Sequence, residues 1–231
     1  MSEPRRPLHW EFLGRVSYAE ALALQLATRA AVKSGEGPER FLLLEHPHVY
    51  TLGRNATQAD VLAAPEWLAA RGVEVAECDR GGQVTYHGPG QLVGYPVVNL
   101  SPDRRDIRRY VRDLQEVLIR VLAGYGIAAE PRDGQEYIGV WAGEEKIASI
   151  GVHLSRWITT HGFALNVSTD LSYFSGIIPC GLHQVRMTSI ERLTGRAPSL
   201  PEVAAAAARH FGEIFGRELV AAAPQLQTAG V

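Results

Sequence analysis

The chain has 231 residues, of which 46% are hydrophobic and 21% charged, which is typical of one globular domain with a sizeable core. Its formal net charge of −2 argues against a nucleic-acid binder that relies on clustered basic side chains. The sequence has no apolar run of about 18 residues and no secretory signal pattern, so we expect neither a membrane span nor secretion.

Hydrophobic periodicity and turn residues predict one domain over 1–231, with a flexible tail from about 218. In chain order we expect a strand at 9–13, a helix at 17–33, a strand at 41–46, a helix at 65–71, strands at 73–77 and 92–100, a helix at 106–123, a hairpin at 136–154 turning at 142–145, a strand pair at 157–168 and a helix at 201–216. Ser17 suits the N-cap of the first helix, and Pro96 suggests an edge strand or a bulge. The order predicts an α+β fold with a mixed, largely antiparallel sheet flanked by helices.

The helix at 106–123 has two distinct faces. Its apolar positions recur every three to four residues, at Ile107, Val111, Leu114, Leu118 and Val121. The other face carries Arg105, Arg108, Arg109 and Arg112. This basic face is either solvated or docks an acidic partner.

The segment 80–91 is unusually rich in glycine. Pro89 and the strand that follows exclude a dinucleotide fingerprint, and no Gly-Lys-Ser/Thr is present to form a P-loop. The segment is therefore either a loop whose backbone approaches a ligand closely or a pair of tight turns between strands.

Cysteine and lysine are both rare. Cys78 and Cys180 lack disulfide-framework or zinc-site spacing, so we expect a reduced, cytoplasmic protein. Pro179 and Gly181 constrain the turn at Cys180, so this thiol is either a presented nucleophile or a buried core residue. Lys146, one of only two lysines, starts an apolar strand and is either a desolvated base or a hairpin lysine with an exposed amine.

The remaining candidates give weaker signals. Cys78 reads as a core residue, and His46-Pro47-His48 lacks the carboxylate partners expected of a metal site. His87, His161 and His183 lie in loops that could line a site, although structural hydrogen bonding is the commoner role of such residues.

Five segments together resemble the lipoyl(octanoyl) transferase family. They are EHPHVYTLGR (45–54), RGGQVTYHGPGQLVGYPVVNL (80–100), KIASIGV (146–152), RWITTHGFALNV (156–167) and IIPCGL with the following MTSI (177–190). They occur in family order and cover most of residues 40–190. An ordered match of this length is far more specific than a single glycine motif.

The resemblance implies a fold shared with the catalytic domains of biotin and lipoate protein ligases. It implies transfer of an octanoyl group from octanoyl-acyl carrier protein to a lysine of lipoyl domains, namely those of 2-oxo-acid dehydrogenase complexes and of the glycine cleavage system H protein. This reaction is the first step of endogenous protein lipoylation, and it needs no cofactor or metal.

The resemblance also assigns residues. It implies that Cys180 carries the acyl group as a thioester and that Lys146 is the base that lowers its pKa. The implied substrate pocket comprises Arg80, Gly81, Gly82, Gln83, Val84, Thr85, Tyr86, His87, Ser149, Ile150, Gly151, Gly162, Phe163 and Ala164. Phe163 departs from the leucine expected there, a change that narrows the acyl pocket or only repacks it.

Two other functions remain open from the sequence. One is an ATP-dependent ligase of the lipoate or biotin type, which activates a free acid as an adenylate and needs no cysteine nucleophile. The other is a scaffold that binds lipoyl domains without catalysis. The presence of both Cys180 and Lys146 favours the transferase.

Overall fold

The computed structural model describes residues 5–134, 137–178 and 185–221. In this part of the chain, eight strands form a large mixed sheet with the order β10-β8-β9-β6-β2-β1-β11, and β7 pairs with β8 beside this path. The strands are β1 (Arg6–Arg15), β2 (Glu39–Glu45), β6 (Gln91–Val97), β7 (Gly139–Ala142), β8 (Glu145–Ser155), β9 (Ile158–Asn166), β10 (Arg186–Met187) and β11 (Arg217–Ala221). The central pairs β2–β6, β6–β9 and β8–β9 are antiparallel, whereas β1 pairs in parallel with β2 and β11.

A second sheet has the order β4-β3-β5. Its strands are β3 (Val49–Leu52), β4 (Glu74–Glu77) and β5 (Val84–His87), and α2 (Pro65–Ala70) lies in the connection between β3 and β4. The 3-10 segment Leu171–Gly176 supplies Phe174 to the core beneath this small sheet, where it packs with Tyr50 and Tyr86. The small sheet thereby holds the glycine-rich segment at one end of the large sheet.

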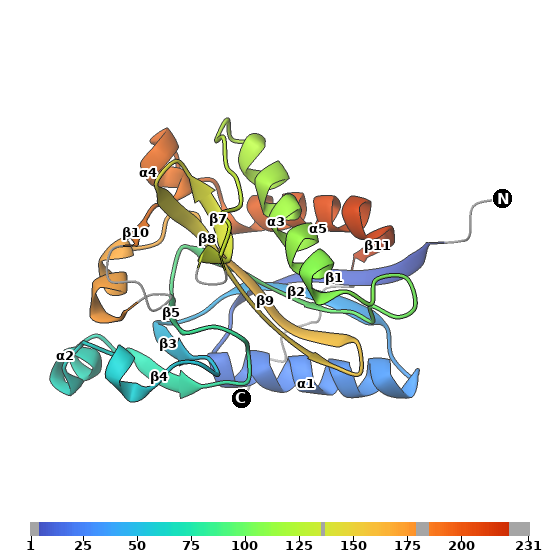
Figure 1. Ribbon diagram of the computed structural model, residues 1–231, viewed down its shortest axis with the longest axis horizontal. Helices are drawn as coiled ribbons and strands as arrows, with labels where there is room; N and C mark the ends of the chain where they lie inside the picture. Colours follow the sequence, from blue (N-terminus) through green and yellow to red (C-terminus); the bar gives the residue numbers. More distant parts are fainter. Residues whose placement is uncertain (1–4, 135–136, 179–184, 222–231) are drawn as a thin grey trace, which may run out of the picture.

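Helices cover both faces of the large sheet. Figure 1 shows α1 (Tyr18–Ser34) along one face and α3 (Ile107–Ala123) with α5 (Leu200–Phe215) on the other. The main core lies under α3 and α5, where Phe41 of β2 packs against Phe163 and Phe211 at ring-centroid distances of 6.1 and 4.8 Å. None of the described helices is long and apolar enough to cross a membrane.

Most of the elements expected from the sequence are confirmed, including the N-cap. The Ser17 hydroxyl accepts from the backbone N–H of Glu20, whose side chain accepts in turn from the backbone N–H of Ser17. The predicted hairpin is the β7–β8 pair. The fold class expected from the sequence is also confirmed.

Three expectations are wrong. Residues 157–168 do not form a strand pair, because β9 is one strand that pairs with β6 and β8. Pro96 does not mark an edge, because β6 lies between β2 and β9; instead, the β6–β9 ladder covers only 91–94 and ends before the proline. Residues 218–221 are not a flexible tail but part of β11, while 222–231 lie outside the described residues.

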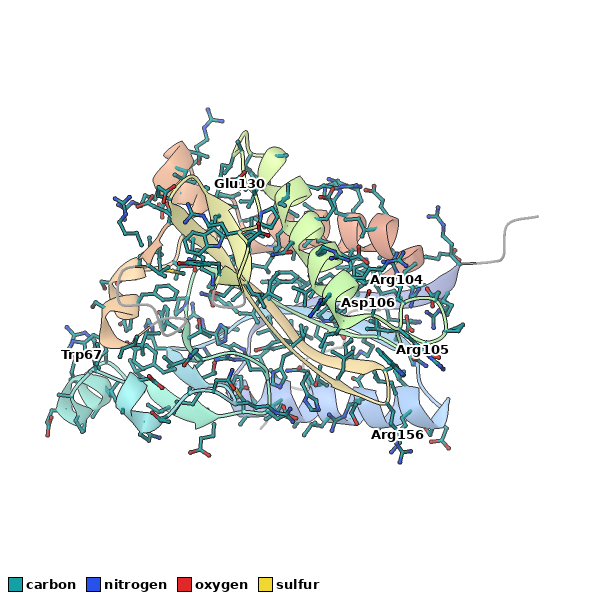
Figure 2. The ribbon with its side chains drawn as sticks, in the orientation of Figure 1. Trp67, Arg104, Arg105, Asp106, Glu130 and Arg156 are labelled. Carbon is teal, nitrogen blue, oxygen red and sulfur yellow. The ribbon has the colours of Figure 1, made fainter. Side chains whose placement is uncertain are left out.

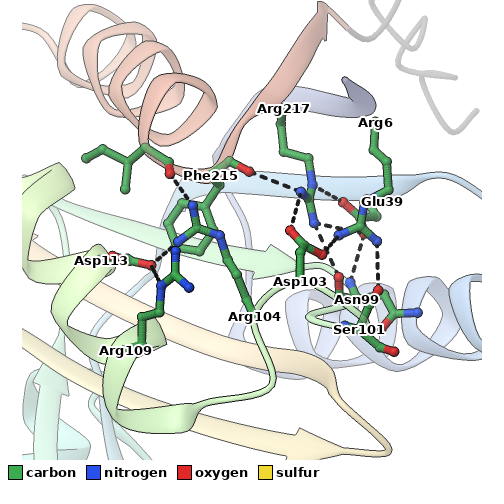
Figure 3. Close-up of polar contacts among 11 residues, drawn as sticks. Arg6, Glu39, Asn99, Ser101, Asp103, Arg104, Arg109, Asp113, Phe215 and Arg217 are labelled. Carbon is green, nitrogen blue, oxygen red and sulfur yellow. Dashed lines mark hydrogen bonds and ion pairs between the residues drawn. The ribbon is translucent and has the colours of Figure 1, made fainter. Parts of the chain in front are cut away.

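A buried ion pair links β11 to β2, the two strands that pair in parallel with β1. Arg217 of β11 donates from Nε to Oε2 of Glu39 on β2, with the two atoms 2.7 Å apart. Figure 3 shows Asp103 and Asn99 beside this pair, so the loop before α3 is tied to the same cluster. The cluster closes the sheet on the side of β1 and β11.

Candidate active site

One cavity of about 610 Å³ lies where the glycine-rich segment, β8, β9 and α3 meet. Every residue that the sequence assigned to the substrate pocket lines this cavity except Tyr86. The structure therefore brings together 80–85 and His87 with 149–151 and 162–164, which are separate in the sequence.

Tyr86 is turned away from the cavity. Alternate residues of a strand point to opposite faces, so on β5 the Tyr86 ring faces away from His87 and into the small core. The ring stacks on Tyr173 with centroids 5.0 Å apart, and its hydroxyl lies 2.8 Å from Nδ1 of His48. Tyr86 therefore belongs to the small core and does not line the cavity.

Glycines let three stretches of backbone approach one another in the cavity wall. Gly151 on β8 pairs with Gly162 on β9, and a Cβ at Gly151 would lie 3.0 Å from the carbonyl oxygen of Gly81. A Cβ at Gly162 would lie 2.1 Å from the carbonyl oxygen of Gly94. The glycine-rich segment thus lies directly against β8. The backbone N–H of Gly81 donates to the carbonyl oxygen of Val152 on β8 at 3.0 Å.

The side chain of Arg80 holds the glycine-rich segment in place through hydrogen bonds. Its guanidinium is buried and donates from one nitrogen to the carbonyl oxygen of Thr51 at 2.6 Å and to the Thr51 hydroxyl at 2.9 Å. A second nitrogen donates to Gly81 O at 3.2 Å. A buried cation in the wall also places positive potential next to the cavity.

Lys146 lies in the cavity wall and is 1% exposed, so the alternative of a hairpin lysine with an exposed amine is wrong. Lys146 lies on β8, which has a neighbouring strand on each side at this position: Lys146 pairs with Trp141 of β7 and with Met187 of β10. The β7–β8 register skips Ile147, and a bulge of this kind re-aims the neighbouring side chains. The fold therefore buries a lysine next to the space that a substrate would occupy.

Cys180 and His183 lie outside the described residues, which stop at Ile178 and resume at Val185. The residues flanking this gap are well held. Ile178 N donates to Asp60 O at 2.9 Å, and Thr188 N, just after β10, donates to Lys146 O at 2.9 Å. The chain thus re-enters the described part beside Lys146.

Burial controls the ionisation of the histidines near the cavity. It lowers the pKa of His46 to about 4, and it lowers the pKa of His87 well below its usual value, with a further contribution from His46. Burial also lowers the pKa of His161, although Oδ1 of Asp79, 2.7 Å from His161 Nε2, opposes that shift. The described residues contain no cluster of ligands suited to a metal ion.

The helix α3 contributes more to the cavity than the sequence suggested. Ile107 was expected in the core face, but it is 48% exposed, and together with Val111 it lines the cavity. Arg108 and Arg112 lie beside them. Arg105 is placed at the exposed N-terminal end of the helix (Figure 2), where it donates to the hydroxyl of Ser101.

The sequence did not identify several other lining residues, among them Tyr18, Tyr95 and Gln115. Tyr18 and Tyr95 come from α1 and β6, and no local pattern connects them with the glycine-rich segment. Gln115 did carry a signal, because it is a polar residue on the buried side of α3. It donates to Gly139 O at 3.0 Å and thereby ties α3 to the start of β7.

Comparison with known proteins gives one consistent family. Residues 17–212 match the family model described as the lipoyl protein ligase A/B catalytic domain. The octanoyltransferase of Solibacter usitatus is 52% identical over 208 residues, covering 90% of this chain and 93% of that protein. The octanoyltransferase of Myxococcus xanthus is 49% identical over 95% of this chain, which spans 62% of that protein's length.

Solved structures agree in fold. Lipoate-protein ligase A bound with ATP superposes with a TM-score of 0.71 at 18% identity, covering 95% of this chain and 90% of that one. The bipartite lipoate protein ligase from Thermoplasma acidophilum gives 0.70 at 18% identity, covering 94% and 86%. At such low identity, these matches establish the architecture and leave the chemistry to the residues in the cavity.

Proposed function

The chain belongs to the lipoyl protein ligase A/B catalytic-domain family and is an acyltransferase, and we propose that it transfers an octanoyl group to a lysine amine of lipoyl domains. The observation that carries the proposal is the similarity to curated octanoyltransferases along nearly the whole chain. A cavity with a buried lysine in its wall supports it.

The proposed donor is octanoyl-acyl carrier protein. The proposed acceptors are the lipoyl domains of 2-oxo-acid dehydrogenase complexes and of the glycine cleavage system H protein, so the reaction would begin endogenous lipoylation. Exchange between two thioesters is close to balanced in free energy, so this route needs neither ATP nor a cofactor. It also needs a reduced thiol, which the cytoplasm maintains.

In the first half-reaction, Cys180 gives its proton to Lys146 and attacks the donor thioester. An ordinary thiol has a pKa of about 8.5 and is only a few per cent thiolate at neutral pH, so a nearby base is needed. The new carbon–sulfur bond forms the octanoyl-enzyme, and the carrier's thiol leaves with a proton. The position of Lys146, buried in the wall of the cavity, supports this role.

In the second half-reaction, the acceptor lysine attacks the octanoyl-enzyme. Both half-reactions pass through a tetrahedral intermediate with negative charge on oxygen. The glycine-rich segment lines the same cavity, so its backbone N–H groups are candidates to stabilise that charge, at about 3–4 kcal/mol for each donor.

The cavity mouth offers a surface for the carrier protein. Arg108 and Arg112 are exposed and line the cavity together with the apolar Ile107. Acyl carrier proteins are acidic, so these arginines are better placed than Arg105 or Arg109 to guide the donor. Arg105 is engaged with Ser101, and Arg109 Nε lies 3.9 Å from Asp113.

Mass spectrometry of the intact protein tests the proposal. The protein is incubated with octanoyl-acyl carrier protein in the absence of ATP, and we expect an octanoyl adduct on the wild type that is missing from Cys180→Ser. Transfer that requires ATP and leaves no adduct would indicate a ligase. Binding of lipoyl domains without transfer under either condition would indicate a scaffold.

A further inference from the structure

A continuous chain of hydrogen bonds runs from His87 to the strand of Lys146. Nδ1 of His87 lies 2.8 Å from Oε1 of Gln91, and Nε2 of Gln91 lies 2.9 Å from Oδ1 of Asn166. Nδ2 of Asn166 donates to Thr188 O at 3.0 Å, and Thr188 N donates to Lys146 O at 2.9 Å. All five residues are buried, so each step is shielded from water.

Backbone carbonyls fix the direction of this chain. A carbonyl oxygen can only accept, so the atom of Asn166 that faces Thr188 O must be its NH2 group, and its oxygen then accepts from Gln91. Gln91 Nε2 also lies 3.2 Å from Tyr86 O, which independently fixes the Gln91 amide the same way round. The Gln91 oxygen therefore faces His87, and Nδ1 of His87 carries the hydrogen.

The opposite edge of the His87 ring is then a bare acceptor. The pKa of His87 is well below its usual value because the ring is buried, so the imidazole is neutral and Nε2 holds a lone pair. Within the described residues, the bond to Gln91 is the only hydrogen bond of this ring. Nε2 is not among the fully enclosed side-chain atoms that lack a partner, so this atom is not sealed off by protein. His87 lines the cavity, so this lone pair opens into it.

We propose that Nε2 of His87 accepts an N–H hydrogen bond from the acceptor lysine amine as that amine attacks the octanoyl-enzyme. The inference rests on the proposed function and assigns its second half-reaction a residue. The carbonyl oxygen and the sulfur of a thioester are acceptors, so a lone pair would repel them. The attacking amine is the substrate group that brings an N–H donor to the reacting carbon.

The step balances without a further reagent. The amine lone pair forms the carbon–nitrogen bond while one N–H points at Nε2, and the carbonyl π electrons move to oxygen. When the carbonyl re-forms, the carbon–sulfur bond breaks and the enzyme sulfur leaves with the electron pair. One amine proton ends on that sulfur, so one N–H and one C–S bond are exchanged for one C–N and one S–H bond. His87 orients the amine and ends the step neutral.

The test separates the two half-reactions. For the wild type and each variant, formation of the octanoyl-enzyme from octanoyl-acyl carrier protein is timed by intact mass. The isolated adduct is then mixed with a lipoyl domain, and its loss is timed. For His87→Leu we expect transfer to be slowed by about 10- to 100-fold more than adduct formation, the range for a lost hydrogen bond to a developing charge. His87→Gln keeps an acceptor near Nε2 and should recover part of the transfer rate.

His9→Leu, on β1 and outside the cavity, is the matched control and should leave both rates unchanged. Equal slowing of both half-reactions by His87→Leu, or no slowing of transfer, overturns the role of His87. Absence of any adduct on the wild type overturns the proposed function itself. Nitrogen-15 NMR of the wild-type imidazole gives a second test that needs no variant: we expect the Nδ1–H tautomer, and an Nε2–H tautomer contradicts the proposal.

Discussion

The amine of Lys146 lies over the indole ring of Trp141, with Nζ 5.5 Å from the ring centroid. The aliphatic part of the lysine fills the space left by Gly139, where a Cβ would lie 2.5 Å from Lys146 Cε. The side chain is therefore confined on one side by the ring and on another by backbone. Such confinement favours a single orientation of the amine toward the cavity.

The first prediction concerns the base. Lys146→Arg should be nearly inactive in forming the octanoyl-enzyme, by about 100-fold or more, because arginine does not lose its proton near neutral pH. Lys146→Met should be equally inactive, since it removes the amine and keeps roughly the volume of the side chain. Timed mass spectrometry measures the activity, and thermal denaturation measures the stability.

Lys33→Arg is the matched control, because Lys33 is exposed in the last turn of α1. It should behave as the wild type in both measurements. If Lys146→Arg formed the adduct at more than about a tenth of the wild-type rate, proton transfer to residue 146 would not be needed, and the assigned role would be wrong.

The second prediction concerns the donor. Arg108→Glu or Arg112→Glu should raise the KM for octanoyl-acyl carrier protein by about tenfold with little change in kcat, because these side chains guide an acidic partner to the cavity. The effect should shrink at high salt. Octanoyl-pantetheine, which lacks the carrier protein, should show no change in KM.

Arg120→Glu gives the control for this prediction. It lies toward the C-terminal end of the same helix and outside the cavity, where it pairs with Glu116. An equal rise in KM for both donors would mean that the arginines shape the cavity and do not dock the carrier.

The sequence predicted local features well. The hairpin that carries Lys146 is set by the alternation and turn residues of a short stretch, so both of its strands were found. The glycine-rich segment was interpreted as a loop throughout, yet 84–87 form β5, and Tyr86, which the family resemblance implied in the pocket, lies on the opposite face of this strand from His87. Recognising a strand there would have separated Tyr86 from His87 by alternation alone.

Contacts between distant elements were beyond the sequence. Ile107 fits the apolar stripe of α3, but it lines the cavity because α5 packs elsewhere along the helix. The hydrogen bonds of Gln91 and Asn166 depend on the pairing of β6 with β9, which no local periodicity specifies. Such positions follow from tertiary packing and become visible only in three dimensions.

The third prediction concerns pH. The folded-state pKa of His46 is about 4, below the unfolded value of 6.5, so the unfolded chain binds the proton first as the pH falls. This contribution to stability is complete above pH ~6.5 and decreases as the pH falls toward 4; for His46 alone the loss is about 2 kcal/mol at pH 5. We expect the melting temperature to fall by about 4–8 °C between pH 7.5 and 5, and by more once His87 contributes.

His46→Gln separates this effect from general acid denaturation. The variant should be less stable at pH 7.5, because the bonds of His46 to Val16 O and the Tyr95 hydroxyl are altered, but its decline with acidification should be shallower. His9→Gln should leave the slope unchanged. An unchanged slope in His46→Gln would contradict the assignment.

The last prediction concerns the buried pair of Arg217 and Glu39. Replacing one partner leaves the other charge buried with only a more exposed counter-ion, Arg6 for Glu39 or Asp103 for Arg217, so Arg217→Met or Glu39→Gln should lower the free energy of unfolding by up to about 3–5 kcal/mol. The double variant should lose less than the sum of the two, because neither residue then loses its nearest counter-ion. Urea denaturation measures the loss for all three variants.

The pair lies among β1, β2 and β11, away from the cavity, so octanoyl transfer by folded variants should keep the wild-type rate. Additive losses, or variants that fold but fail to transfer, would show that this end of the sheet does more than hold the fold.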